Sequence, residues 1–249
     1  TLKVIKMSCY KYWGTIEDIA NKLSSYGDLD KYGDSALDNV DIDEIIEILD
    51  EVEIIAHDKE IDFDSAKHIL DDEKMNKALK LIRKFYVYIG ARLETENALK
   101  ILESDNPTET LDSFHFYERY IGLINNESQL AKFSENKTFV FLGSGPLPLT
   151  LILFRQKFGC KCIGIEIHEE VAELSRKVIK KLGLDDGIIA VTCKLSLHCN
   201  VQYLAEGFPD HLVFCVRIVK HYMHERSCSV ICRYVIIIYS TVPFCRNLI

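Results

Sequence analysis

The sequence has no apolar run long enough to cross a membrane and no excess of basic residues. A membrane helix needs about 20 consecutive apolar residues, and the longest candidate, residues 139–154, is interrupted by two glycines and two prolines. The formal net charge of −8 argues against the basic surface that binds duplex nucleic acid. The N-terminus lacks the apolar core and cleavage site of a signal peptide. These absences predict a cytoplasmic protein that binds neither membrane nor nucleic acid.

Cysteines and charges are unevenly distributed along the chain, whose 249 residues suffice for one large domain or two modest ones. Three of the nine cysteines fall in residues 1–192, whereas six fall in residues 193–249. Acidic residues outnumber basic ones by 35 to 24 up to residue 192, and are outnumbered by 3 to 6 beyond it. The C-terminal tail, residues 193–249, therefore differs in composition from the rest of the chain.

Hydrophobic spacing predicts helices over the first 135 residues, apart from a loop rich in Gly and Asp at residues 24–40. Residues 42–56 have the apolar spacing of an amphipathic helix. Between residues 75 and 93, apolar side chains recur at intervals of four and three, which predicts one long helix over residues 73–102. The apolar stripe of this helix consists of Met75, Leu79, Ile82, Tyr86, Ile89 and Leu93. Asn106 followed by Pro107 is typical of the start of the next helix.

After residue 136 the pattern changes to short apolar runs that alternate with helical segments. Strands are predicted at residues 137–142, 160–167 and 187–191, with helices ending at residues 158 and 181 between them. This order is typical of half of a doubly wound parallel sheet. We therefore predict two domains, a helical domain over residues 1–135 and an α/β domain over residues 136–249.

The first predicted strand ends in a Gly-Ser-Gly turn at residues 143–145, and the second ends in Glu166. Glycines at this turn let backbone N–H groups approach a ligand at a helix N-terminus. An acid 23 residues after Gly143 can accept hydrogen bonds from ribose hydroxyls. A Pro-Leu-Pro sequence replaces the third glycine of a dinucleotide site and leaves little room for a pyrophosphate. The pattern favours S-adenosylmethionine (SAM) over NAD, with a tight turn beside a solvated acid as the purely structural alternative.

In the helical half, Glu94 lies beside the apolar stripe and one turn after Gly90. A glycine inside a helix costs roughly 0.5–1 kcal/mol relative to alanine, so Gly90 indicates a space where Glu94 can meet a ligand. A surface glutamate beside a helix-crossing glycine is the alternative. Tyr117 and Tyr120 share a helix face and have the amphipathic rings of a ligand wall, although core packing is the better explanation of Tyr117.

Several segments of residues 7–191 together resemble the archaeal nicotianamine synthases. The matching strings are IAHDKEIDFDSAKHILDD, ALKLIRKFY, SDNPTETLDSFHFYERY, GSGPLPLT and AELSRKVIKKLG. The resemblance implies a helical N-terminal domain followed by a Rossmann-like domain of the SAM-dependent methyltransferase type. It also implies an enzyme that moves the 3-amino-3-carboxypropyl group of SAM to an amine, either glutamate or a growing nicotianamine-type chain. Methylthioadenosine is released, and the product is a metal chelator, or metallophore.

The resemblance also implies roles for single residues. Glu94 and Tyr120 resemble the family's catalytic glutamate and tyrosine, which orient the attacking amine and accept its proton. The residues expected to bind SAM are Gly143, Ser144, Gly145, Pro146, Leu147 and Glu166. We expect no metal and no tightly bound cofactor, since SAM is a substrate. The expected partners are SAM and an amino-acid acceptor, and a homodimer is left open.

The resemblance ends near residue 191, where the composition changes. Our hypothesis is that residues 193–249 are a frameshift product, which resequencing the locus would test. A zinc site is the competing interpretation, with ligands His221, His224, Cys228 and Cys232. Two strand-like runs, residues 212–219 and 230–239, could extend the sheet. For the whole chain, a SAM-dependent methyltransferase and an inactive SAM-binding remnant remain as alternatives.

Overall fold

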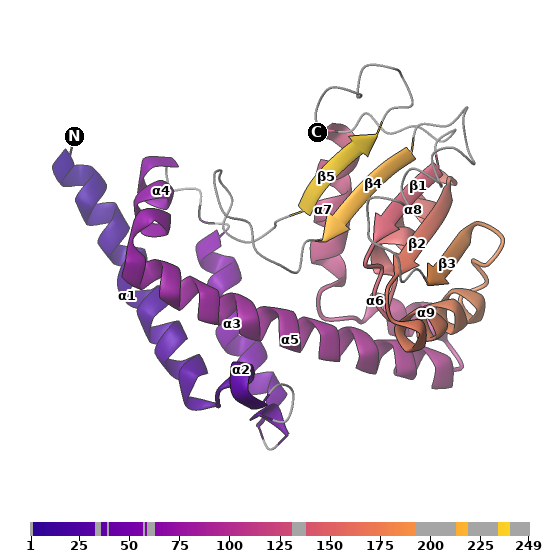
Figure 1. Ribbon diagram of the computed structural model, residues 1–249, viewed down its shortest axis with the longest axis horizontal. Helices are drawn as coiled ribbons and strands as arrows, with labels where there is room; N and C mark the ends of the chain where they lie inside the picture. The colour runs from indigo at the N-terminus through magenta and orange to yellow at the C-terminus, as the bar shows by residue number, and fades with distance from the viewer. Residues whose placement is uncertain are drawn as a thin grey trace. The chain divides into compact units, whose positions relative to one another are not determined.

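The computed structural model describes residues 2–32, 36–38, 40–56, 58, 63–130, 138–192, 213–218 and 234–239. Helices come first along the chain (Figure 1): α1 (Leu2–Ser25), α2 (Leu29–Tyr32), α3 (Ile42–Ala56), α4 (Phe63–Asp71), α5 (Glu73–Glu103), α6 (Pro107–Asp112) and α7 (Tyr117–Leu130). Strands and helices then alternate: β1 (Thr138–Leu142), α8 (Leu149–Phe158), β2 (Lys161–Glu166), α9 (Glu169–Lys181), β3 (Ile188–Thr192), β4 (Val213–Ile218) and β5 (Tyr234–Tyr239). Among the described residues, no helix is long and apolar enough to span a membrane.

The strands form one sheet in the order β3-β2-β1-β4-β5 (Figure 1). The first four strands of this order are parallel, and β5 pairs with β4 in the antiparallel sense. The chain passes from β1 outward to β2 and β3, then returns to β4 on the other side of β1. The carboxyl end of β1 is therefore a topological switch point, where open α/β sheets bind their ligands. The predicted helical region followed by a Rossmann-like α/β fold is confirmed.

The tail contributes two described strands. β4 and β5 lie within the strand-like runs at residues 212–219 and 230–239, so the prediction that these runs extend the sheet is confirmed. The four candidate zinc ligands lie outside the described residues. The frameshift hypothesis stays a prediction.

Most predicted helix boundaries agree with the structure. The helix predicted over residues 42–56 is α3, and the long helix predicted over residues 73–102 is α5. α6 begins at Pro107 after the N-cap Asn106, whose side chain makes no cap hydrogen bond. Instead, Asn106 Nδ2 donates to Glu109 Oε2 at 2.7 Å. The predicted loop at residues 24–40 contains the short helix α2, so it is not a continuous loop.

By packing, the chain divides into two compact units, with the boundary between Arg92 and Leu93 inside α5. In the first unit, α1 packs against α3 and α4. Phe85, rather than Tyr86 of the predicted stripe, is fully buried, and Tyr86 donates its hydroxyl hydrogen to Glu53 Oε1 at 2.6 Å. Other fully buried side chains of this core are Ile19, Leu23, Ile45, Leu49, Met75 and Ile89.

The second unit joins the C-terminal part of α5, α6 and α7 to the sheet. Its core cluster includes Ala98 of α5 and Ile124 of α7 together with residues of β1 and α8. The rings of Phe139 and Phe154 stack there with their centroids 3.9 Å apart. The domain division at residues 135 and 136 stays a prediction, and this core draws residues from both sides of it.

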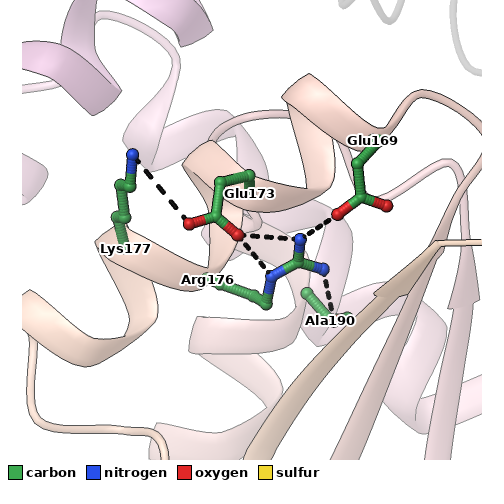
Figure 2. A network of polar contacts seen from close by, with 5 residues as sticks. All are labelled: Glu169, Glu173, Arg176, Lys177 and Ala190. Atoms are coloured by element: carbon green, nitrogen blue, oxygen red, sulfur yellow. Dashed lines mark hydrogen bonds and ion pairs between the residues drawn. The ribbon is translucent and has the colours of Figure 1, made fainter.

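A polar network attaches α9 to the edge strand β3. Figure 2 shows the guanidinium of Arg176 donating to Glu169 and Glu173 of the same helix and to the backbone oxygen of Ala190 in β3. The distance from Arg176 Nη1 to the Ala190 oxygen is 3.3 Å. Because the two glutamates are exposed, we assign this network to orienting α9 rather than to a large stabilisation.

Arg155 connects the end of α8 to the turn before β2 and to the turn before β3. Its guanidinium donates to the backbone oxygens of Gly159 at 2.5 Å and Cys160 at 3.3 Å, and pairs with Asp186 at 3.0 Å. The side chain also crosses Gly187, where an added Cβ would overlap Arg155 Nε. Gly187 therefore provides the space in which this arginine lies.

We expect Gly187→Ala to lower the free energy of unfolding by about 1–3 kcal/mol, because the new methyl group displaces Arg155 from its three partners. Urea denaturation measures the change. Gly122→Ala is the matched control, since an added Cβ at this helical position meets nothing within 4 Å. That control should be neutral or stabilising. Equal stability of Gly187→Ala and the unsubstituted chain would contradict the prediction.

Tyr117 is expected to make a pH-dependent contribution to the stability of the fold. Burial, reinforced by a hydrogen bond to Asp112, raises the pKa of Tyr117 from 10.0 to about 12. A folded-state pKa above the unfolded value stabilises the fold below pH 10, and this stabilisation is lost as the pH rises from 10 to about 12. We expect Tyr117→Phe to flatten the dependence of the unfolding free energy on pH between 10 and 12. Identical slopes for the two proteins, measured by denaturation at several pH values, would contradict this.

Candidate active site

The glycine turn lies at the switch point, directly after β1. Gly143 and Gly145 have φ angles of +77° and +71°, which side-chain-bearing residues rarely adopt. The Gly143 N–H donates to the backbone oxygen of Ile165 at 2.7 Å, which fixes the turn to the end of β2. Both glycines are therefore required by the backbone conformation that the turn takes.

Glu166, the last residue of β2, is buried beside this turn with an exposed fraction of 7%. Its Oε2 accepts the Gly145 N–H at 3.2 Å, and its Oε1 accepts the N–H groups of Ile167 at 2.8 Å and His168 at 3.4 Å. Hydrogen bonds from three backbone donors compensate the buried carboxylate for lost water. They also fix its oxygens at the carboxyl end of the sheet, next to the glycine turn.

Glu94 of α5 and Tyr120 of α7 meet through a side-chain hydrogen bond. The Tyr120 hydroxyl donates to Glu94 Oε1 at 3.0 Å, and both side chains are half-buried. The other carboxylate oxygen of Glu94 lies against the glycine turn, because a Cβ built on Gly145 would be 3.0 Å from Oε2. The absence of a side chain at Gly145 lets the carboxylate approach the loop backbone.

Four of the predicted site residues thus converge on one place. Gly145 has Glu166 at its N–H and Glu94 at its Cα, and Tyr120 contacts Glu94 from the opposite helix. Two carboxylates close to one glycine create a negative potential that attracts a cationic ligand. A phenol and a carboxylate in direct contact can orient an amine and accept its proton.

The other predicted loop residues are buried. Ser144 is 6% exposed and Leu147 is 2% exposed, and Leu147 belongs to the core cluster of this unit. Pro146 is also buried. A ligand would therefore contact Leu147 through its backbone rather than its side chain. Assignment of all these residues to SAM binding, and of Glu94 and Tyr120 to catalysis, stays a prediction.

Two residues of this region, Gly164 and Asn97, were not predicted from the sequence, and a third, Gly90, was predicted to open a pocket. Gly164 in β2 lies against Ser144, and its signal in the sequence is a glycine inside an apolar strand. Asn97, one turn after Glu94 in α5, is buried and donates from Nδ2 to the Thr110 oxygen at 3.3 Å. At Gly90 an added Cβ would meet nothing within 4 Å. The prediction of a pocket there stays a prediction.

The sequence profile of the nicotianamine synthase protein family matches residues 14–194. This match includes Glu94, Tyr120, the glycine turn and Glu166. The chain belongs to the nicotianamine synthase family. The match ends two residues after β3, close to where the composition of the chain changes. No curated protein matches the chain.

Three solved structures of the family member MtNAS are similar to this chain. A point mutant in complex with S-adenosylmethionine is 48% identical over 73% of this chain and 65% of that chain, with a TM-score of 0.63. MtNAS in complex with MTA and tNA is 49% identical over 73% and 66%, with a TM-score of 0.65. A further structure of an MtNAS point mutant is 39% identical over 82% of this chain and 82% of that chain, with a TM-score of 0.67. This chain therefore spans slightly less than two thirds of the first two relatives.

Among the described residues, no group of three or more His, Cys, Asp or Glu side chains could hold a metal ion. Cys160 and Cys162 are buried as free thiols with their sulfurs 3.6 Å apart. The predicted site residues with titratable side chains, Glu94, Tyr120 and Glu166, are two carboxylates and a phenol.

Proposed function

We propose that the chain transfers the 3-amino-3-carboxypropyl group of SAM to the amine of glutamate or of a growing nicotianamine-type chain. Membership of the nicotianamine synthase family supports this function, as do the MtNAS structures with S-adenosylmethionine and with MTA and tNA. The observation that carries the proposal is the hydrogen bond between Tyr120 and Glu94 beside the glycine turn. The product is a metal chelator, and the expected acceptor is an amino acid.

SAM suits the charge and the hydrogen-bond acceptors of this site. Its sulfonium and ammonium groups are positive, and Glu94 and Glu166 lie on either side of Gly145. A carboxylate has about four acceptor positions. The three backbone N–H groups leave about one of these positions, so Glu166 can accept a hydrogen bond from one ribose hydroxyl while they continue to hold it. The positive sulfonium near two carboxylates is stabilised by their charge, most strongly where the site excludes water.

The transfer step is a nucleophilic substitution at the γ-carbon next to the sulfonium. The lone pair of the acceptor nitrogen forms the new N–C bond, and the C–S bond breaks with its electron pair moving to sulfur. Methylthioadenosine leaves as a neutral thioether. The acceptor nitrogen must be unprotonated before attack and loses a proton afterwards, and the Glu94 carboxylate is the group that accepts it. Tyr120 orients that carboxylate and can contact the same amine.

Incubation of the purified chain with SAM and glutamate, followed by mass spectrometry, tests the function. We expect methylthioadenosine and glutamate adducts that increase by whole aminocarboxypropyl units. S-adenosylhomocysteine would instead identify methyl transfer. Neither product, with a melting temperature that SAM raises, would identify a SAM-binding chain without activity, because a ligand that binds only the native state stabilises it.

A further inference from the structure

Gly164, in the middle of β2, occupies a position where a glycine needs an explanation. The strand lies inside the sheet between β1 and β3, and its burial pattern is apolar around this residue. Glycine in a strand interior is unfavourable and often marks a close approach by another part of the chain. The φ angle of Gly164 is outside the left-handed region, unlike those of Gly143 and Gly145. Its backbone conformation therefore does not require glycine, but the space around it does.

The space at Gly164 is taken by Ser144 and Leu151. A Cβ at Gly164 would lie 2.7 Å from Leu151 Cδ1 and 2.8 Å from both Cβ and Oγ of Ser144. These distances are shorter than real Cβ contacts. Leu151 Cδ1 is the far end of a flexible side chain and can rotate away. Ser144 Cβ is bonded directly to the loop backbone, so relief of that contact requires the loop itself to move.

Ser144 is held in place by shape rather than by polar contacts. Its Oγ is buried, and no hydrogen-bond partner for it occurs within the described parts of the chain. A buried hydroxyl without a partner costs about 1–3 kcal/mol, so hydrogen bonding does not explain why the side chain lies against β2. The close fit over Gly164 does. Ser144 and Gly164 thus form a contact between the glycine turn and the second strand.

The position of Ser144 determines that of Gly145, the next residue. The Gly145 N–H donates to Glu166 at 3.2 Å, and its Cα faces the Glu94 carboxylate. A shift of Ser144 away from β2 would change both the hydrogen bond from Gly145 to Glu166 and the approach of Glu94 to Gly145. We infer that Gly164 is a positioning residue for SAM binding: by lacking a Cβ, it lets Ser144 lie against β2 and so sets Gly145 between Glu166 and Glu94. This inference rests on the proposed function, since it assumes that SAM binds at this turn.

A double-mutant cycle tests the inference. The proteins are the full chain and its Gly164→Ala, Ser144→Gly and doubly substituted variants, and isothermal titration calorimetry gives the Kd for SAM. We expect Gly164→Ala to raise the Kd by about tenfold, because Ser144 has to move away from β2 and takes the Gly145 N–H away from Glu166. In the Ser144→Gly background, which removes the contacted Cβ and Oγ, the same substitution should raise the Kd by less than about threefold. Gly14→Ala, at an open helical position, is the control expected to bind SAM normally.

Each other outcome is decisive. An unchanged Kd in Gly164→Ala overturns the inference, as does an equal loss in both backgrounds, which would assign the effect to Leu151. Thermal melting without SAM separates a fold defect from a binding defect. Gly164→Ala alone can fail to fold, and the doubly substituted protein then decides. If the double variant folds and binds SAM with the Kd of Ser144→Gly, the inference is supported. If the double variant does not fold, the inference is overturned. If the unsubstituted chain does not bind SAM, the proposed function itself fails, which is a separate result.

Discussion

Glu94→Gln is expected to lower the rate of methylthioadenosine formation by about 10²–10⁴-fold, the usual contribution of a general base. Glutamine keeps the size of the side chain, and its amide oxygen can still accept the hydrogen bond that Tyr120 donates to Glu94 Oε1 at 3.0 Å. It cannot accept a proton from the acceptor amine. The loss should therefore appear in kcat, measured at saturating SAM and glutamate.

The matched control is Glu103→Gln, the same substitution at the exposed C-terminal residue of α5. This variant should retain full turnover. Retention of turnover in Glu94→Gln would show that another group accepts the proton. A large rise in the Kd for SAM without a change in kcat would assign Glu94 to substrate binding instead.

The secondary structure was largely predictable because its signals are local. The bounds of α3 and the start of α6 at Pro107 follow from apolar spacing and from capping preferences over a few residues. Tyr86 of the predicted stripe is half-buried, with its hydroxyl on Glu53 of α3, whereas its neighbour Phe85 is fully buried. Which of two adjacent aromatic side chains is buried depends on the helices packed against α5, and the periodicity of α5 alone carries no signal of those helices.

The contacts of the site depend on pairings that no local signal encodes. Glu94 and Tyr120 are 26 residues apart in the sequence, and Gly145 lies on a third element. Family resemblance named these residues without saying that the Glu94 carboxylate faces the loop backbone. The sequence did contain the signal of Gly164, a glycine inside an apolar strand. What it could not supply was the identity of the atoms that need the space.

Gly145→Ala is expected to raise the Kd for SAM by about tenfold or more, because two effects oppose alanine there. A φ of +71° costs an L-residue about 1–2 kcal/mol, so the loop backbone should leave this conformation. The Gly145 N–H would then turn away from Glu166. In the original conformation, the new Cβ would lie 3.0 Å from Glu94 Oε2 and press against the carboxylate.

Gly183→Ala separates these effects from backbone strain alone. Gly183 has a similar φ of +67°, but an added Cβ there would meet nothing within 4 Å. Both variants should lose free energy of unfolding in urea because both place alanine in the left-handed region, and Gly145→Ala should lose more because of its contact with Glu94. Only Gly145→Ala should lose SAM affinity in calorimetry. Equal SAM affinities for the two variants would mean that the close approach of Glu94 and Glu166 to Gly145 plays no part in binding.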